Sequence, residues 1–115
     1  QLIRRAPIAE TVARYAVNLC HASRPGSPTA PDFVKTWVSW GAGTRGTQNL
    51  ILAAKARAIL QGRSHVAVSD IQAVAPDVLR HRILTNFRAE ADHVSAAEVI
   101  AKLIETVPQP ASGLS

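Results

Sequence analysis

The sequence feature that most restricts the fold is a long apolar run in the middle of the chain. From Leu50 to Leu60 every residue is Leu, Ile or Ala except Lys55 and Arg57. No Gly or Pro interrupts the run, and Ala and Leu favour helices strongly. The run predicts a helix from about Thr44 to Gln61 that is apolar nearly all round, and such a helix is usually central and buried.

Further helices are predicted on both sides of this one. Residues 8–23 carry an apolar stripe at helical spacing. The segment Ser69–Gln72 has the pattern of a capping box and starts a helix in which Pro76 predicts a kink or a restart. A second capping box, Ser95–Glu98, starts the last helix, and Pro108 stops it.

Two shorter segments have the composition of strands. Residues 33–40 are rich in β-branched and aromatic residues, and residues 83–87 form a second extended segment that we expect to pair with the first. The predicted fold is therefore mainly α: a bundle of about four helices with a short two-stranded pairing. Residues 1–107 form one domain, and residues 108–115 are predicted to be a disordered tail.

Composition limits the function only broadly. The 115 residues fit one domain, and the formal charge of +5 suits nucleic acid, nucleotide phosphates or an acidic protein surface without choosing among them. Cys20 is the only cysteine, which agrees with a reducing compartment. No apolar run approaches the roughly 18 residues of a membrane-spanning helix, and the start at Gln1 has no signal-peptide pattern. We expect a cytoplasmic location and no membrane partner.

Catalytic chemistry is absent from the sequence. No Gly-x-x-x-x-Gly-Lys-Ser/Thr phosphate loop occurs, so the chain is expected to hydrolyse no nucleotide alone and to hold no catalytic residue of its own. The side chains able to bind metals lack metal-ligand spacing, so no metal site is expected. These side chains are Cys20, His21, His65, His81 and His93.

The most informative stretch is Gly41-Ala42-Gly43-Thr44-Arg45-Gly46-Thr47, which joins the first extended segment to the central helix. A helix N-terminus offers free amide groups and the positive end of the helix dipole. Arg45 adds a fixed charge with five donors in the first turn, an arrangement that suits a phosphate oxygen, with Gly41, Gly43 and Thr44 as the nucleotide-facing turn. The alternative is an ordinary glycine-rich turn with a solvated arginine.

A second basic group, Arg80-His81-Arg82, follows the third helix. Cations there stabilise a helix C-terminus, and they also suit a contact with a nucleotide, nucleic acid or a neighbouring subunit. Both interpretations stay open. Trp37 and Trp40 are expected to be core or interface aromatics.

The motifs in this order resemble the lid domain of MoxR-type AAA+ ATPases over residues 3–107. They are Trp40-Gly41-Ala42-Gly43-Thr44-Arg45-Gly46, Ala53-Ala54-Lys55-Ala56-Arg57-Ala58, Gly62-Arg63, Val68-Ser69-Asp70-Ile71 and Leu79-Arg80-His81-Arg82-Ile83. The family's arginine motif reads Gly-Ala-Ser-Pro-Arg-Ala, so Gly43, Thr44 and Gly46 depart from it. Losing the Pro and Ala is expected to loosen the first helical turn.

The resemblance implies a lid that follows a nucleotide-binding core in the same chain, with ATP and Mg²⁺ as cofactors of the full-length protein. It implies the sensor-2 role for Arg45 and an interface or structural role for Arg80-His81-Arg82. It also implies a ring, expected to be a hexamer, and chaperone-like work on partner complexes, often beside von Willebrand factor A domain proteins.

A different class of function stays open on the residues alone: a free-standing basic helical module that binds nucleic acid. Two helices joined through residues 62–69 motivate it, but a helix-turn-helix usually has a tighter turn. Asp70 and Asp77 on the second helix would face phosphates badly. We therefore do not expect nucleic acid among the partners.

Overall fold

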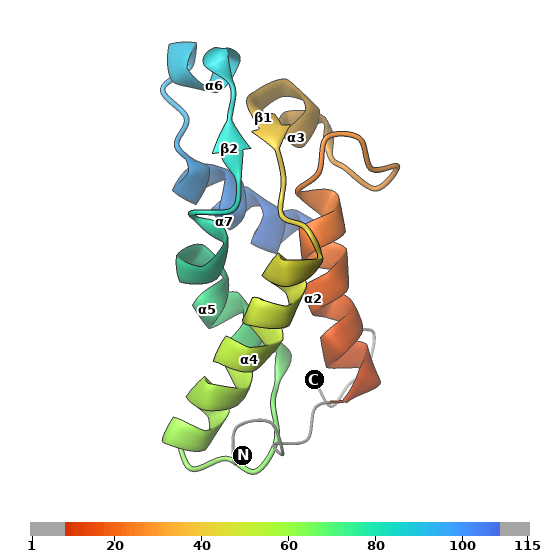
Figure 1. The fold of residues 1–115 in the computed structure, drawn as a ribbon, viewed down its shortest axis with the longest axis vertical. Coiled ribbons are helices and arrows are strands. Elements are labelled where there is room, and N and C mark those ends of the chain that lie inside the picture. Colours follow the sequence, from red (N-terminus) through yellow and green to blue (C-terminus); the bar gives the residue numbers. More distant parts are fainter. Residues whose placement is uncertain (1–8, 109–115) are drawn as a thin grey trace.

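The central apolar run forms the longest helix, α4 (Thr44–Leu60), in the computed structural model, which describes residues 9–108. Helix α2 (Glu10–Ala22) lies along one side of α4, and α5 (Val68–Leu79) packs on it most extensively (Figure 1). Helix α7 (Ala96–Thr106) closes the bundle against α5 and α2. These are the four helices expected from the sequence, each within two residues of its predicted start.

Helix α4 is central, as predicted, but only one of its faces is buried. Its buried positions, Gly46, Leu50, Ala54 and Ala58, recur every four residues and therefore form one stripe. The small side chains in this stripe let α2 and α5 approach closely. On the other face Leu52 and Leu60 are 41% and 86% exposed, because no other element of residues 9–108 covers that side.

The core between these helices is aliphatic. Its largest fully buried side chains come from all four long helices, so each helix contributes one apolar face. They include Tyr15, Leu19, Leu50, Ile71, Leu79, Ile100 and Leu103.

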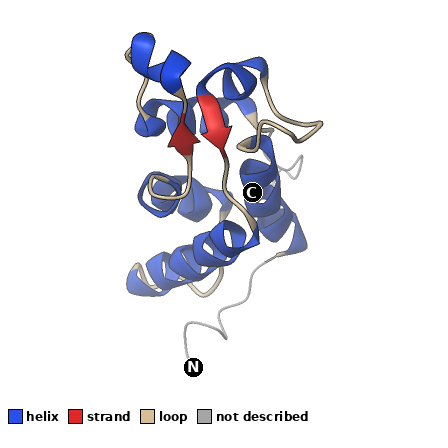
Figure 2. Cartoon of the chain, turned by 45° about the horizontal axis from the view of Figure 1, so that its top comes forward, coloured by secondary structure: helices blue, strands red, loops and turns tan. Residues whose placement is uncertain are grey.

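A two-stranded antiparallel pairing and two short helices cap one end of the bundle, at the top of Figure 1 and in front in Figure 2. Strand β1 (Val38–Trp40) pairs antiparallel with β2 (Leu84–Thr85), with Val38 opposite Thr85 and Trp40 opposite Leu84. The predicted pairing of the two extended segments is therefore confirmed.

Residues 33–40 are nevertheless not extended throughout, which corrects the prediction. Their first part belongs to helix α3 (Asp32–Trp37), and only the last three residues form β1. Asp32 lies in the first turn of α3, where its charge favours the helix N-terminus. Phe33 and Trp37, four residues apart, stack with ring centroids 6.5 Å apart, so helical spacing explains these aromatics better than strand alternation.

The described residues contain six helices rather than about four. One of the additional helices, α6 (Phe87–Ala91), begins where an extended segment was expected to continue. Asn86 starts it, because its side-chain oxygen accepts a hydrogen bond from the amide of Ala89 at 3.0 Å. The side-chain amide of Asn86 also donates to the carbonyl of Thr36, which ties α6 to α3.

The start of α5 also differs from its prediction. The helix begins at Val68, and Asp70, not Ser69, supplies the capping side chain: the amide of Ala67 donates to its carboxylate at 2.8 Å. The predicted capping box at Ser69 is therefore shifted by two residues. The helix runs through Pro76 without a restart.

The start of α7 agrees with its prediction. Ser95 accepts from the amide of Glu98, and Glu98 accepts from the amide of Ser95, so the capping box is confirmed. The predicted tail lies outside the described residues from 109 onward.

Candidate functional site

The turn that leads into α4 lies between the bundle and the two paired strands. Gly43 occupies the position before the helix, and no side chain caps the amides of the first turn. Amides at this position without an intrahelical partner are donors at the positive end of the helix dipole. The first turn of α4 therefore offers free amide groups to an anion, as the sequence predicted. No side chain competes for these amides.

Arg45 and Thr44 lie exposed in this first turn. Within residues 9–108, Arg45 makes no ion pair. A cation in the first helical turn opposes the dipole, so its position does not stabilise α4. An exposed guanidinium without a partner is available to an external anion.

The group Arg80-His81-Arg82 is divided by the fold. Arg80 and His81 are exposed in the turn after α5, whereas Arg82 is half-buried. A methyl group added to Gly46 would lie 3.6 Å from Cδ of Arg82, so the stem of Arg82 packs beside the first turn of α4. The structure thus brings Arg82, but not its two exposed neighbours, against the turn that carries Arg45.

The family motif has Ala at the position of Gly46. Close packing around Gly46 explains why this chain has glycine there. An added methyl group would lie 3.0 Å from Cβ of Ala42, closer than nearly all real contacts, and 3.7 Å from Sγ of Cys20. Burial raises the pKa of the Cys20 thiol, while Thr47 and then the charges of Arg24 and Arg82 act in the opposite direction. Two arginines from different elements therefore approach the buried side of this turn.

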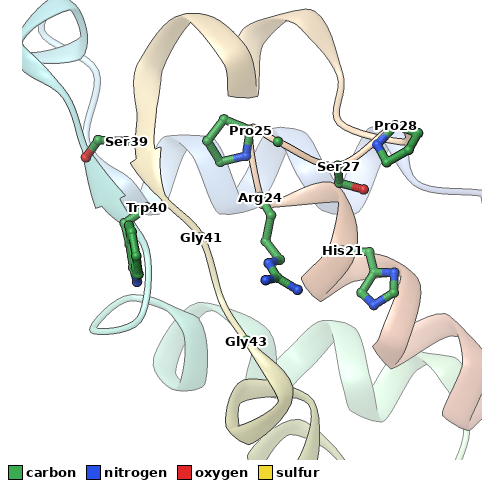
Figure 3. A pocket seen from close by; sticks show the side chains of 10 residues that line it. His21, Arg24, Pro25, Ser27, Pro28, Ser39, Trp40, Gly41 and Gly43 are labelled. Atoms are coloured by element: carbon green, nitrogen blue, oxygen red, sulfur yellow. The ribbon is translucent and has the colours of Figure 1, made fainter.

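A pocket with a volume of about 670 Å³ lies beside the turn (Figure 3). Gly41 and Gly43 line it on one side, and His21 and Arg24 come from the end of α2 and the residues after it. Trp40, which is 69% exposed, forms part of its wall. Thr44 and Arg45 are not lining residues, so the pocket and the predicted nucleotide-facing turn coincide only at the two glycines.

The end of α2 supports the turn directly. The hydroxyl of the fully buried Ser23 accepts a hydrogen bond from the amide of Ala42 at 3.0 Å and donates to the carbonyl of Cys20 at 2.6 Å. A methyl group on Gly41 would lie 2.3 Å from the carbonyl oxygen of Ser23. Sequence reasoning missed Ser23, because no local pattern links it to a residue nineteen positions later.

Sequence reasoning also missed an ion cluster at the opposite end of α4. Asp70 is fully buried and receives Arg63 on both carboxylate oxygens, with Nε of Arg57 at 3.3 Å. Burial by itself raises the pKa of Asp70, but the hydrogen bonds from Arg63 and Ala67 and the charges of Arg63 and Arg57 together lower it. Asp70 therefore does not face outward, and its contacts are structural.

The two tryptophans have different surroundings. Trp37 is half-buried against the core, and its Nε1 donates to a carboxylate oxygen of Asp92 at 2.9 Å. Nζ of Lys102 lies 5.9 Å from the centre of a Trp37 ring, within range of a cation–π contact. Trp40 instead leaves most of its surface exposed beside Leu84, which is 62% exposed.

Neither a metal site nor a membrane segment is found in the described part of the chain. Residues 9–108 contain no group of three or more His, Cys, Asp or Glu side chains placed to hold a metal ion. None of their helices has the length and apolar character needed to cross a membrane.

This arrangement of helices and turn is shared with known proteins. Residues 33–103 match the sequence profile of the AAA lid domain, and the chain therefore belongs to the AAA lid domain family. The crystal structure of a Cytophaga hutchinsonii protein to which ATPase activity is ascribed superposes with a TM-score of 0.85 and 33% identity. The match covers 92% of this chain and 32% of that one.

Named relatives give the type of lid. Chaperone MoxR1 of Mycobacterium tuberculosis is 38% identical over 96 residues, covering 84% of this chain and 26% of the relative. Protein MoxR of Methylorubrum extorquens is 39% identical over 77 residues, covering 64% and 22%. The chain is thus an AAA+ lid of the MoxR type, as the resemblance implied, and it spans about a quarter of the length of these relatives.

Proposed function

We propose that this lid covers ATP held by a nucleotide-binding core in the same full-length protein, with Arg45 as the sensor-2 residue that contacts the γ-phosphate region. The exposed guanidinium of Arg45, in an uncapped first turn and without an ion-pair partner in residues 9–108, carries the proposal. Arg82 beside Gly46 adds positive potential to the same turn. Charge-assisted hydrogen bonds from arginine to phosphate are strong and directional.

In this proposal the core and the lid supply different groups to the nucleotide. A phosphate loop and the Mg²⁺ ligands that neutralise the phosphates are expected in the core, because neither occurs in this chain. The lid then contributes one charge whose position depends on the angle between lid and core. Such a contact is made with ATP and lost with the departing phosphate, which couples hydrolysis to lid movement.

The wider setting is part of the same proposal. We place the full-length protein in a cytoplasmic ring, a hexamer, that remodels or matures partner complexes beside von Willebrand factor A domain proteins. The name of one relative, Chaperone MoxR1, supports this setting in outline. The exposed Arg80 and His81 face away from the bundle and suit a contact with a neighbouring subunit.

ATP turnover by the full-length protein tests the role of Arg45. At saturating ATP and Mg²⁺ we expect Arg45→Ala to lower turnover at least about tenfold, a barrier increase of roughly 1.4 kcal/mol. Arg14→Ala is the matched control, because it removes the same charge from an exposed site on α2 that lies on no proposed interface.

Two outcomes bear on the proposal. Turnover lowered by Arg45→Ala but not by Arg14→Ala supports it. Unchanged turnover together with unchanged nucleotide affinity in Arg45→Ala contradicts the sensor role. A mobility shift with DNA that weakens steeply with salt would instead favour the nucleic-acid module.

A further inference from the structure

The turn that precedes α4 is held from one direction by the end of α2. Ser23 has no exposed surface, and its hydroxyl uses both of its hydrogen-bonding roles. It donates to the carbonyl of Cys20 at 2.6 Å within α2 and accepts from the amide of Ala42 at 3.0 Å. The bond to Cys20 orients the hydroxyl, so its lone pair faces the amide of Ala42.

The same end of α2 also holds the turn by close contact. A methyl group on Gly41 would lie 2.3 Å from the carbonyl oxygen of Ser23, 2.6 Å from its carbonyl carbon and 2.7 Å from Cα of Arg24. All three are backbone atoms at the end of a helix and have little freedom to move aside. The turn therefore lies directly on the end of α2, at a separation that only glycine permits.

This clamp, formed by Ser23, Gly41 and Ala42, fixes the start of α4. Ala42 is buried and immediately precedes Gly43, from which the first turn of α4 begins. No side chain caps that turn, so the clamp acts on the residue that leads into it. Arg45 follows Ala42 by three residues, and its backbone position depends on where the clamp places the turn.

We infer that Ser23 is a positioning residue for Arg45. The inference rests on the proposed sensor role of Arg45 and explains how that role survives the departures from the family motif. Gly43, Thr44 and Gly46 replace residues that would stiffen the turn, and the clamp supplies the stiffness from α2 instead. Ser23 is fully buried, so it acts through the amide of Ala42 and not by contact with nucleotide.

A double-mutant cycle on ATP turnover by the full-length protein tests the inference. The cycle compares Ser23→Ala, Arg45→Ala and the double variant at saturating ATP and Mg²⁺. Ser23→Ala leaves the amide of Ala42 buried and unpaired, and we expect it to lower turnover about three- to tenfold. If Ser23 acts through Arg45, the double variant turns over at the rate of Arg45→Ala alone.

The outcomes separate this inference from the proposed function. Losses that multiply in the double variant, or unchanged turnover in Ser23→Ala beside a lowered turnover in Arg45→Ala, overturn the positioning role and leave the sensor role intact. Unchanged turnover together with unchanged nucleotide affinity in Arg45→Ala overturns the proposed function first and the inference with it.

Two further variants cover the case in which Ser23→Ala does not fold. Ser23→Cys keeps a side chain of similar shape with a weaker hydrogen-bonding atom, and its turnover is expected between those of the wild type and Ser23→Ala. Gly41→Ala pushes the turn away from the end of α2 by steric contact and is expected to show the same non-additivity with Arg45→Ala.

Controls match each change. Thr36→Ala removes another hydroxyl that donates to a backbone carbonyl, in α3, and should leave turnover unchanged. Gly26→Ala adds a methyl group where no atom lies within 4 Å and should also leave turnover unchanged. A loss in these controls equal to the loss in Ser23→Ala and Gly41→Ala would contradict the clamp.

Discussion

Arg63 donates hydrogen bonds from both terminal nitrogens of its guanidinium to the two carboxylate oxygens of Asp70, whose side chain has no exposed surface. The amide of Ala67 donates to the same carboxylate at 2.8 Å, and Arg57 lies beside it. These contacts join the end of α4, the connecting loop and the start of α5. They explain why Gly62-Arg63 and Ser69-Asp70 belong to the motifs that carried the resemblance.

Replacing Asp70 is expected to weaken the fold. Asp70→Asn leaves two arginines facing a neutral side chain, and loss of one partner of a buried pair costs several kcal/mol. About a third of each arginine side chain is exposed, 32% for Arg63 and 37% for Arg57. Water can therefore solvate both guanidinium groups in Asp70→Asn, which reduces the cost. We expect the free energy of unfolding to fall by about 2–3 kcal/mol in urea denaturation.

Asp77→Asn is the control for that variant, because Asp77 is exposed on the same helix and makes no ion pair within residues 9–108. Its free energy of unfolding should change by less than about 0.5 kcal/mol. Equal losses in the two variants would show that the cluster adds no stability.

The stability of the chain is also expected to depend on pH through Asp70. Its pKa is lowered in the folded state, so the carboxylate stabilises the fold above its unfolded pKa of about 3.9. That stabilisation is lost as the pH falls through the lower folded value. Below about pH 4 the wild type should therefore lose free energy of unfolding more steeply than Asp70→Asn.

Urea denaturation at a series of pH values measures this difference. A residual slope is expected in Asp70→Asn, because the pKa of Asp92 is also lowered, first by the hydrogen bond from Trp37 and then by Arg88. Parallel pH profiles for the wild type and Asp70→Asn would contradict the lowered pKa of Asp70.

The end of α4 provides a separate test of backbone geometry. Gly62 has a φ of +75°, its amide donates to the carbonyl of Ile59, and the amide of Arg63 donates to that of Ala58. These two hydrogen bonds form a Schellman motif. The motif places Arg63 where its guanidinium can bind Asp70. Because nothing lies within 4 Å of an added methyl group, Gly62→Ala should cost only the strain of positive φ, about 1 kcal/mol.

Gly26→Ala is the matched change at a glycine without positive φ and with equally open surroundings. Thermal unfolding of both variants should show a lower midpoint for Gly62→Ala only. A similar midpoint in the two variants would contradict the strain at Gly62.

The long elements were predictable because their signals are local. The apolar periodicity of α2, α5 and α7, the apolar run of α4 and the capping box at Ser95 each lie within a single segment. The short helices α3 and α6 were missed, because five or six residues provide less than two turns of periodicity. In α3 the β-branched and aromatic residues favour a strand when taken alone. Packing on the core stabilises the helix instead.

The candidate site was predictable only in part, for a related reason. Arg45 and its glycine-rich turn are adjacent in sequence, so their relationship to the start of α4 could be predicted. The clamp from Ser23 and the approach of Arg82 to Gly46 join residues far apart in the chain, and only the fold brings them together. The burial of Asp70 could not be predicted either, because its partners Arg57 and Arg63 lie outside its own helix.

The affinity of the full-length protein for ATP and for ADP, measured with Arg45→Ala and Arg14→Ala in the presence of Mg²⁺, tests the central claim most directly. A guanidinium that contacts the γ-phosphate contributes to ATP binding and little to ADP binding, so we expect Arg45→Ala to weaken ATP by about tenfold and ADP by less than about twofold. Arg14→Ala should change neither affinity. Equal weakening of ATP and ADP by Arg45→Ala, or no weakening of either, would contradict the account.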